Sequence, residues 1–121
     1  MIQNLTRRRT CLVIACCACL QALPLWAGPH TLDECFEAGD FIANAARARD
    51  AGMSEDAFIG RMRQDYEVIQ NFPSDLRWFV HDPEDEQFLL NEAKSVFDRP
   101  MTPDLHRVDF LQNCVDSLAQ P

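Results

Sequence analysis

The chain of 121 residues has the length of one domain, and its 11 basic and 19 acidic residues give it a net charge of −8. A negative field repels nucleic acid and anionic membrane surfaces, so neither is an expected partner. The charge is compatible with a basic protein partner, although solubility alone is the simpler explanation.

Residues 1–27 have the three parts of a secretory signal peptide. A basic block at residues 7–9 is followed by an apolar run over residues 11–26, and Ala27 supplies the small residue at the cleavage position. A membrane span needs about 20 apolar residues, and Pro24 interrupts this run. We therefore predict cleavage after Ala27, a periplasmic or secreted protein, and no stable membrane span after cleavage. A retained membrane anchor is the competing interpretation.

Two other export routes have weaker support. Residues 13–16 resemble a lipobox, which would lipidate Cys16, but the apolar segment after Arg9 would then be short. Residues 6–9 resemble a twin-arginine signal, but Thr10 and Cys11 stand where an apolar residue usually follows. The general export route is preferred, and lipidation of Cys16 stays open.

The mature chain, residues 28–121, keeps eight basic and all nineteen acidic residues, a net charge of −11. Four of the six cysteines leave with the signal peptide, and only Cys35 and Cys114 remain. Two cysteines in a short exported domain are typical of one disulfide. The loop that it closes would stabilise the fold by about 4–5 kcal/mol in the chain-entropy model. A reactive or metal-binding pair is the alternative, but the chain has no Cys-x-x-Cys spacing and no histidine near either cysteine.

Four helix starts can be read from the sequence. Each has a Ser, Thr or Asp side chain that can accept a hydrogen bond from a first-turn amide, followed by acids or by proline. The four are Thr31 in a capping box with Glu34, Ser54, Asp82 before Pro83, and Thr102 before Pro103. Gly52, Pro73 and Pro100 mark helix ends, and a short helical turn is expected within residues 74–80.

Apolar residues recur at spacings of three and four after each start. The four predicted stripes are Cys35, Ala38, Ile42, Ala45 and Ala46; Ile59, Met62, Tyr66 and Ile69; Leu89, Leu90, Ala93, Val96 and Phe97; and Val108, Leu111, Cys114, Val115 and Leu118. No alternating strand pattern is present. The sequence therefore predicts an all-α fold, a small bundle of four main helices plus a short fifth segment, with the disulfide joining the first and last helices.

Two stretches were weighed as metal sites. Cleavage after Ala27 would place His30 third from a free N-terminus, a position that often binds Cu²⁺ through backbone amides, but Pro29 has no amide hydrogen. Residues 81–86 hold a histidine and four acids, but a calcium loop needs alternating oxygen ligands and a glycine. The helix dipole explains these acids. No metal or cofactor site is therefore expected.

Other candidate sites are few. The sequence suggests no Ser–His or free Cys–His pair and no glycine-rich phosphate loop, so no catalytic residue is assigned and the protein is expected not to be an enzyme. His106 is expected on the surface. Trp78 and Phe79 lie in the most apolar short segment of the mature chain. They are candidates for contact with a partner, or they close one end of the bundle, which is the favoured interpretation.

From Cys35 to Cys114 the chain resembles a loose class of small exported bacterial helical proteins of unknown function with one disulfide. The shared features are an early cysteine, an Ala-Arg-x-Arg-Asp-x-Gly-x-Ser stretch at residues 46–54, a Val-Phe-x-x-Pro stretch at residues 96–100, and Phe110 before Cys114. The resemblance implies a helical envelope protein and carries over no catalytic residue.

Two functions fit these expectations. The first is an unidentified interaction protein that binds another protein, as an inhibitor or immunity protein does, and the acidic charge favours a basic partner. The second is an acid-stress periplasmic chaperone, which would share the small size, the helices, the export and the disulfide. Because carboxylates at helix starts lose their charge in acid, the chain is expected to loosen at very low pH.

Overall fold

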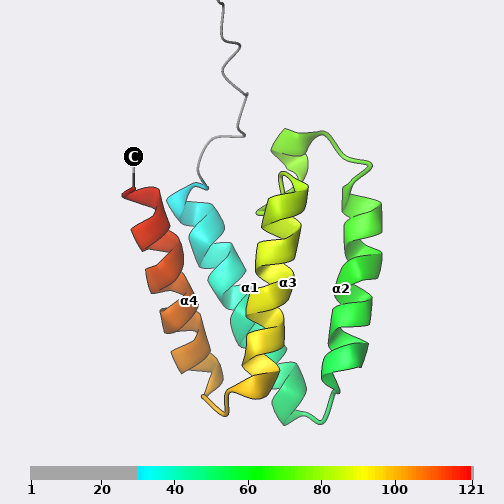
Figure 1. Cartoon of the computed structure of the whole chain (residues 1–121), viewed down its shortest axis with the longest axis vertical. Helices are drawn as coiled ribbons and strands as arrows, with labels where there is room; N and C mark the ends of the chain where they lie inside the picture. The colour runs from blue at the N-terminus through cyan, green and yellow to red at the C-terminus, as the bar shows by residue number, and fades with distance from the viewer. Residues whose placement is uncertain (1–29, 121) are drawn as a thin grey trace, which may run out of the picture.

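The computed structural model describes residues 30–120, and successive helices run in opposite directions along one bundle (Figure 1). The predictions of the signal peptide, its cleavage site and lipidation at Cys16 concern residues outside this range. The elements are α1 (Leu32–Asp50), α2 (Glu55–Ile69), the 3₁₀ turn η1 (Ser74–Leu76), α3 (Pro83–Asp98) and α4 (Pro103–Leu118). The described residues contain no strand, and the predicted all-α fold is confirmed.

All four predicted helix caps are present. Thr31 and Glu34 form the reciprocal capping box, and the side chains of Ser54, Asp82 and Thr102 each accept from the amide three residues further on. The chain leaves α1 through Gly52, whose φ of +93° is a conformation that side chains disfavour. Helix α2 ends at Ile69, earlier than the proline predicted to stop it.

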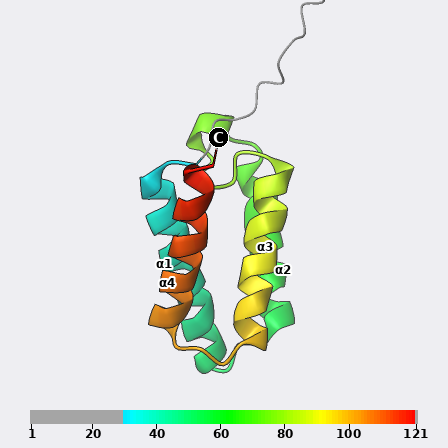
Figure 2. The same cartoon turned by 60° about the vertical axis from the view of Figure 1, so that its left-hand side comes forward.

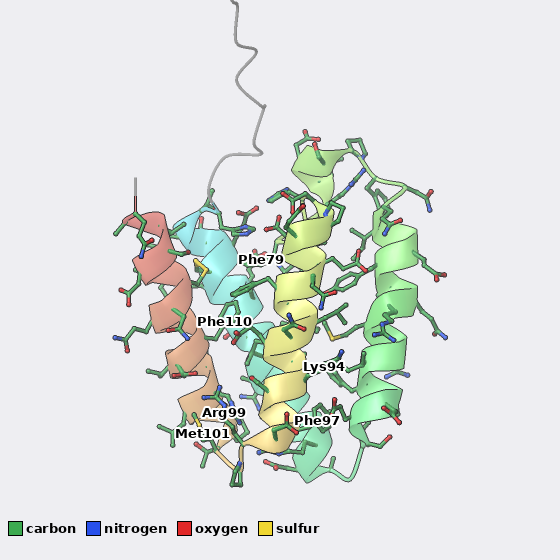
Figure 3. The ribbon with its side chains drawn as sticks, viewed as in Figure 1. Phe79, Lys94, Phe97, Arg99, Met101 and Phe110 are labelled. Atoms are coloured by element: carbon green, nitrogen blue, oxygen red, sulfur yellow. A yellow bond between two sulfur atoms is a disulfide. The ribbon has the colours of Figure 1, made fainter. Side chains whose placement is uncertain are left out.

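The helices form two pairs, with α1 beside α4 and α2 beside α3, and contacts between α1 and α3 join the pairs (Figure 2). The core lies where the pairs meet, and Phe79 and Phe110 reach it from the loop before α3 and from α4 (Figure 3). The predicted stripes of the first three helices are buried there, with Ile69 and Phe97 partly buried at the margin.

The disulfide predicted between Cys35 and Cys114 is confirmed. It joins α1 to α4 with a distance of 5.7 Å between the two Cα atoms, and both cysteines are buried. The bridge lies toward the end of the bundle at which α1 begins and α4 ends (Figure 3). It therefore fastens the most extensive helix contact of the fold, that between α1 and α4.

Helix α4 differs from its predicted orientation. Its buried residues are His106, Phe110 and Cys114, one helical turn apart. Val108 and Val115, predicted to be buried, are 56% and 36% exposed. The prediction was right for Cys114, and Leu111 and Leu118 are partly buried against the core. It was wrong for Val108 and Val115, because the face of α4 that contains His106 and Phe110 is the one that meets the core.

Within residues 30–120, no helix has the length and apolar character needed to cross a membrane.

Candidate functional site

The structure brings two helix starts together at one end of the bundle, and each contributes one histidine and one carboxylate. His30 precedes α1 and Glu34 lies in its first turn, while His81 precedes the cap of α3 and Asp85 lies in its first turn. We call these four residues the histidine–carboxylate cluster. Helix N-termini favour negative charge, so both carboxylates occupy positions that the helix dipoles stabilise.

The hydrogen bonds of the cluster cross from one helix start to the other. His30 Nε2 lies 2.8 Å from Asp85 Oδ1, and His81 Nε2 lies 2.5 Å from Glu34 Oε1. The second oxygen of Asp85 accepts from the backbone amide of His81 at 3.0 Å. The side chains of all four residues are less than one-fifth exposed. The cluster therefore ties the start of α1 to the start of α3.

The two histidines and the two carboxylates favour each other's charged forms. Burial lowers the pKa of His30, but the hydrogen bond to Asp85 and the nearby carboxylates outweigh it, and the pKa lies above its usual value. Burial likewise lowers the pKa of His81, but the Ser74 carbonyl and Glu34 raise it overall. Burial raises the pKa values of Glu34 and Asp85, but their hydrogen bonds and the histidines lower both overall.

Phe79 forms the floor of the cluster. The His30 ring stacks on it, with 3.8 Å between ring centroids and 9° between the planes. Phe79 has no exposed surface and belongs to the core, as the favoured interpretation expected, whereas the alternative of a partner contact at this residue does not fit its burial. Trp78 is half-buried, adopts a left-handed φ of 56° and meets Phe41 edge-on. A partner contact at Trp78 stays a prediction.

A second feature is an apolar surface along α4 and the neighbouring edge of α1. Arg107 of α4 lies over the ring of Phe36, 6.0 Å from its centroid, and pairs with Asp40 one turn further along α1. Phe36 therefore lies on the side of α1 that faces α4. We call this surface the outer stripe, which consists of Leu32, Phe36, Val108, Leu111 and Val115; all are exposed except Leu111, which is partly buried.

A cavity of about 350 Å³ opens between α2, the loop after it and the start of α3. Its lining is mixed, with apolar side chains beside Gln70, Arg77, Asp82 and Glu86. Tyr66 contributes a buried hydroxyl that makes no hydrogen bond to any described residue. Burial and the nearby Glu86 and Asp65 carboxylates raise the pKa of this phenol well above its usual value.

His106, expected on the surface, is fully buried. It lies near the start of α4, which is at the opposite end of the bundle from the starts of α1 and α3 (Figure 1). Its Nε2 lies 3.0 Å from the carbonyl oxygen of Arg99, to which it donates. The Arg49 guanidinium donates to the carbonyls of Val96, Arg99 and Met101 at 2.7, 2.8 and 2.7 Å. These two side chains hold the turn between α3 and α4, where Figure 3 labels Arg99 and Met101.

Comparisons with known proteins assign no family: no protein-family model, curated protein or solved structure matches the chain.

The sequence did not indicate the cluster, although all of its members are visible in it. The two hydrogen bonds that cross between the helix starts join residues separated in the chain by 55 and by 47 positions. The sequence neighbours of each histidine do not reveal such contacts. One pattern in the sequence could have indicated the cluster. At the starts of both α1 and α3, a histidine lies just outside the helix and a carboxylate lies in its first turn.

Proposed function

We propose that this is an exported, non-enzymatic protein that binds another protein through its outer stripe. An inhibitor or immunity protein that covers a basic surface of its target would act in this way. The observation that supports the proposal is the second apolar stripe of α4, whose valines lie outside the buried core of the bundle.

The arrangement of the stripe, and not its apolar character alone, supports an interface. Single exposed apolar residues are normal on any protein. Here Val108, Leu111 and Val115 recur at helical spacing on α4, and Leu32 and Phe36 are exposed one turn apart on α1, the helix that packs most extensively against α4. Apolar residues at helical spacing are typical of a helical face that packs against a partner.

Charge indicates the kind of partner. Asp104 lies one turn before Val108 on α4. Asp40, one turn after Phe36 on α1, is already paired with Arg107, so the relevant charge is mainly that of the whole chain. The mature chain has a net charge of −11. A second copy would bring the same charge against itself, whereas a partner with apolar side chains among Lys and Arg would complement it.

The test uses the exported, disulfide-bonded protein with a photo-crosslinking residue at position 108, and a matched protein with the same residue at position 68. Val68 of α2 is 60% exposed, close to the 56% of Val108, but lies on a different pair of helices. We expect one envelope protein to be crosslinked from position 108 and not from position 68. That protein is then purified and titrated by calorimetry.

The proposal requires one-to-one binding that weakens with added salt and at least tenfold in Val108→Asn/Val115→Asn, but not in Val68→Asn. Three outcomes would each overturn the proposal: equal crosslinking from both positions, crosslinks only to a second copy, or binding that is unchanged in Val108→Asn/Val115→Asn.

The acid-stress chaperone is the second candidate, and the stripe does not favour it. Such a chaperone needs apolar surface that becomes available only in acid, whereas the outer stripe is exposed in the folded bundle. The chaperone would be supported instead if the protein suppresses client aggregation at pH 3 but not at pH 7, and if Val108→Asn/Val115→Asn suppresses it equally well.

A further inference from the structure

The hydrogen bonds of the histidine–carboxylate cluster determine which ring nitrogens carry protons. His81 Nδ1 lies 2.7 Å from the Ser74 carbonyl oxygen, which can only accept, so Nδ1 carries a hydrogen. His30 Nε2 donates in the same way to Asp85 Oδ1 at 2.8 Å. In the neutral rings the lone pairs are therefore on His81 Nε2 and His30 Nδ1.

Both of these nitrogens lie near the same carboxylate. His81 Nε2 lies 2.5 Å from Glu34 Oε1, and His30 Nδ1 lies 3.5 Å from Glu34 Oε2. His30 Nδ1 is buried and makes no hydrogen bond with the described residues. Lone pairs that face a carboxylate repel it unless a positive charge lies between them. That charge is either a proton on each ring or one cation that all three side chains share.

We propose that His30 Nδ1, His81 Nε2 and the Glu34 carboxylate bind one divalent transition-metal ion of the Zn²⁺ class. The three donor atoms lie within 4.8 Å of one another. Around Zn²⁺, nitrogen and oxygen ligands at about 2.0–2.2 Å would be about 3.4 Å apart in a tetrahedron, so movements of about an ångström complete the site. Three protein ligands leave the fourth position to water.

Each proposed ligand already has the supporting hydrogen bond that metal ligands in proteins usually have. Asp85 holds His30, the Ser74 carbonyl holds His81, and the backbone amide of Thr31 donates to Glu34 Oε2 at 2.8 Å. The Phe79 ring fixes the plane of His30 from below. All three ligands are therefore held in place before a metal arrives, which keeps the cost of ordering the site small.

The donors also select the class of metal. Two imidazole nitrogens and one carboxylate suit Zn²⁺, Cu²⁺ or Ni²⁺, whereas Ca²⁺ and Mg²⁺ prefer an all-oxygen set. Cys35 lies next to Glu34 but is held in the disulfide, so it offers no thiolate for a soft ion such as Cu⁺. Metal binding must displace any protons from the rings, so affinity falls as pH falls.

The test is a calorimetric titration of the exported, disulfide-bonded protein with Zn²⁺ at pH 7.5, repeated with Mg²⁺. We expect one Zn²⁺ per chain, proton release on binding, a melting temperature that rises with Zn²⁺ concentration, and no comparable effect of Mg²⁺. His30→Gln, His81→Gln and Glu34→Gln should each weaken Zn²⁺ binding at least tenfold. Glu84→Gln is the matched control, because it removes an exposed carboxylate from the same helix start without touching the cluster.

A second readout remains informative if one variant folds poorly. In nuclear magnetic resonance spectra, Zn²⁺ should shift the ring signals of His30 and His81 and leave those of His106, at the other end of the bundle, in place. Three outcomes would overturn the proposal: a loss of affinity in Glu84→Gln as large as that in the ligand variants, unchanged affinity in all three ligand variants, or ring signals that do not respond to Zn²⁺. Each would show either adventitious binding to an acidic surface or a cluster held by protons alone. Val108→Asn/Val115→Asn should bind Zn²⁺ normally, so failure of the metal site and failure of the outer stripe can be told apart.

Discussion

Arg49 Nη1 lies 2.7 Å from the carbonyl oxygen of Val96, 47 residues further along the chain. The two residues belong to the two stretches, residues 46–54 and 96–100, on which the resemblance to small exported proteins rests. In this fold the first stretch supplies the guanidinium, and the second supplies two of the three carbonyls that it binds. Both stretches therefore have a structural role in this chain, which is to hold the turn between α3 and α4.

Arg49→Lys should destabilise the fold by about 2–4 kcal/mol, because an ammonium cannot reach three carbonyls with the geometry of a guanidinium. The measurement is urea unfolding followed by circular dichroism. Arg47→Lys is the matched control, since Arg47 is exposed and its side chain donates to Asn44 one turn earlier on the same helix. Similar small losses in both variants would contradict a structural role for Arg49.

Removal of the disulfide should lower the free energy of unfolding by about 4–5 kcal/mol, since the bridge closes a loop with a sequence separation of 79. The measurement compares Cys35→Ser/Cys114→Ser with the oxidised protein in urea. A reducing agent should weaken the parent to the same degree and leave the double variant unchanged. A parent insensitive to reduction would indicate that α1 and α4 associate equally well without the bond.

His106 should make the protein less stable in mild acid. Burial lowers its pKa, and the Arg49 and Arg99 charges lower it further against the opposing effects of the Arg99 carbonyl and Asp109. Because the folded pKa lies below the unfolded value of 6.5, the contribution of His106 is complete above pH 6.5 and declines as pH falls toward the folded pKa. His106→Gln should therefore cost more stability at pH 7.5 than at pH 5, as urea unfolding at the two values would reveal. A cost that is the same at both would exclude a depressed pKa.

Phe79→Ala should destabilise the fold by about 3–5 kcal/mol, because the ring is completely buried beneath His30. Leu76→Ala, three residues earlier and 68% exposed, should change stability by less than about 0.5 kcal/mol. Thermal unfolding of both variants measures the difference. A mild effect of Phe79→Ala would restore the idea that this segment is a surface contact.

Tyr66→Phe should leave stability within about 1 kcal/mol of the parent or raise it, because the buried hydroxyl makes no hydrogen bond to the described residues. Met62→Ala, on the same buried face of α2, should cost about 2–5 kcal/mol. Chemical unfolding of both variants is the measurement. A loss above 2 kcal/mol in Tyr66→Phe would reveal a partner for the hydroxyl inside the cavity.

The local features of the fold could be predicted from the sequence, because each depends on neighbouring residues. Thr31, Ser54, Asp82 and Thr102 were identified as caps from their own side chains and the residues that follow them. The disulfide was predictable because Cys35 and Cys114 are the only cysteines left after the predicted cleavage.

The orientation of α4 and the position of His106 could not be predicted. Val108, Leu111 and Val115 present as regular a stripe as the residues that are buried, and apolar spacing alone does not say which stripe meets the core. His106 is buried because Arg99 accepts from it, within a turn whose carbonyls are held by Arg49, 57 residues earlier in the chain. The histidine–carboxylate cluster was hidden for the same reason, since it forms only when two helix starts meet.

The disulfide also sets an order of events for a chain that crosses a membrane with its N-terminus first. On the proposed export route Cys35 would arrive in the oxidising compartment early, but its partner Cys114 lies in α4, after α2, η1 and α3. During that interval the thiol of Cys35 would be unpaired, and α1 would lack the helix against which it packs most extensively. Formation of the disulfide would then mark the arrival of α4.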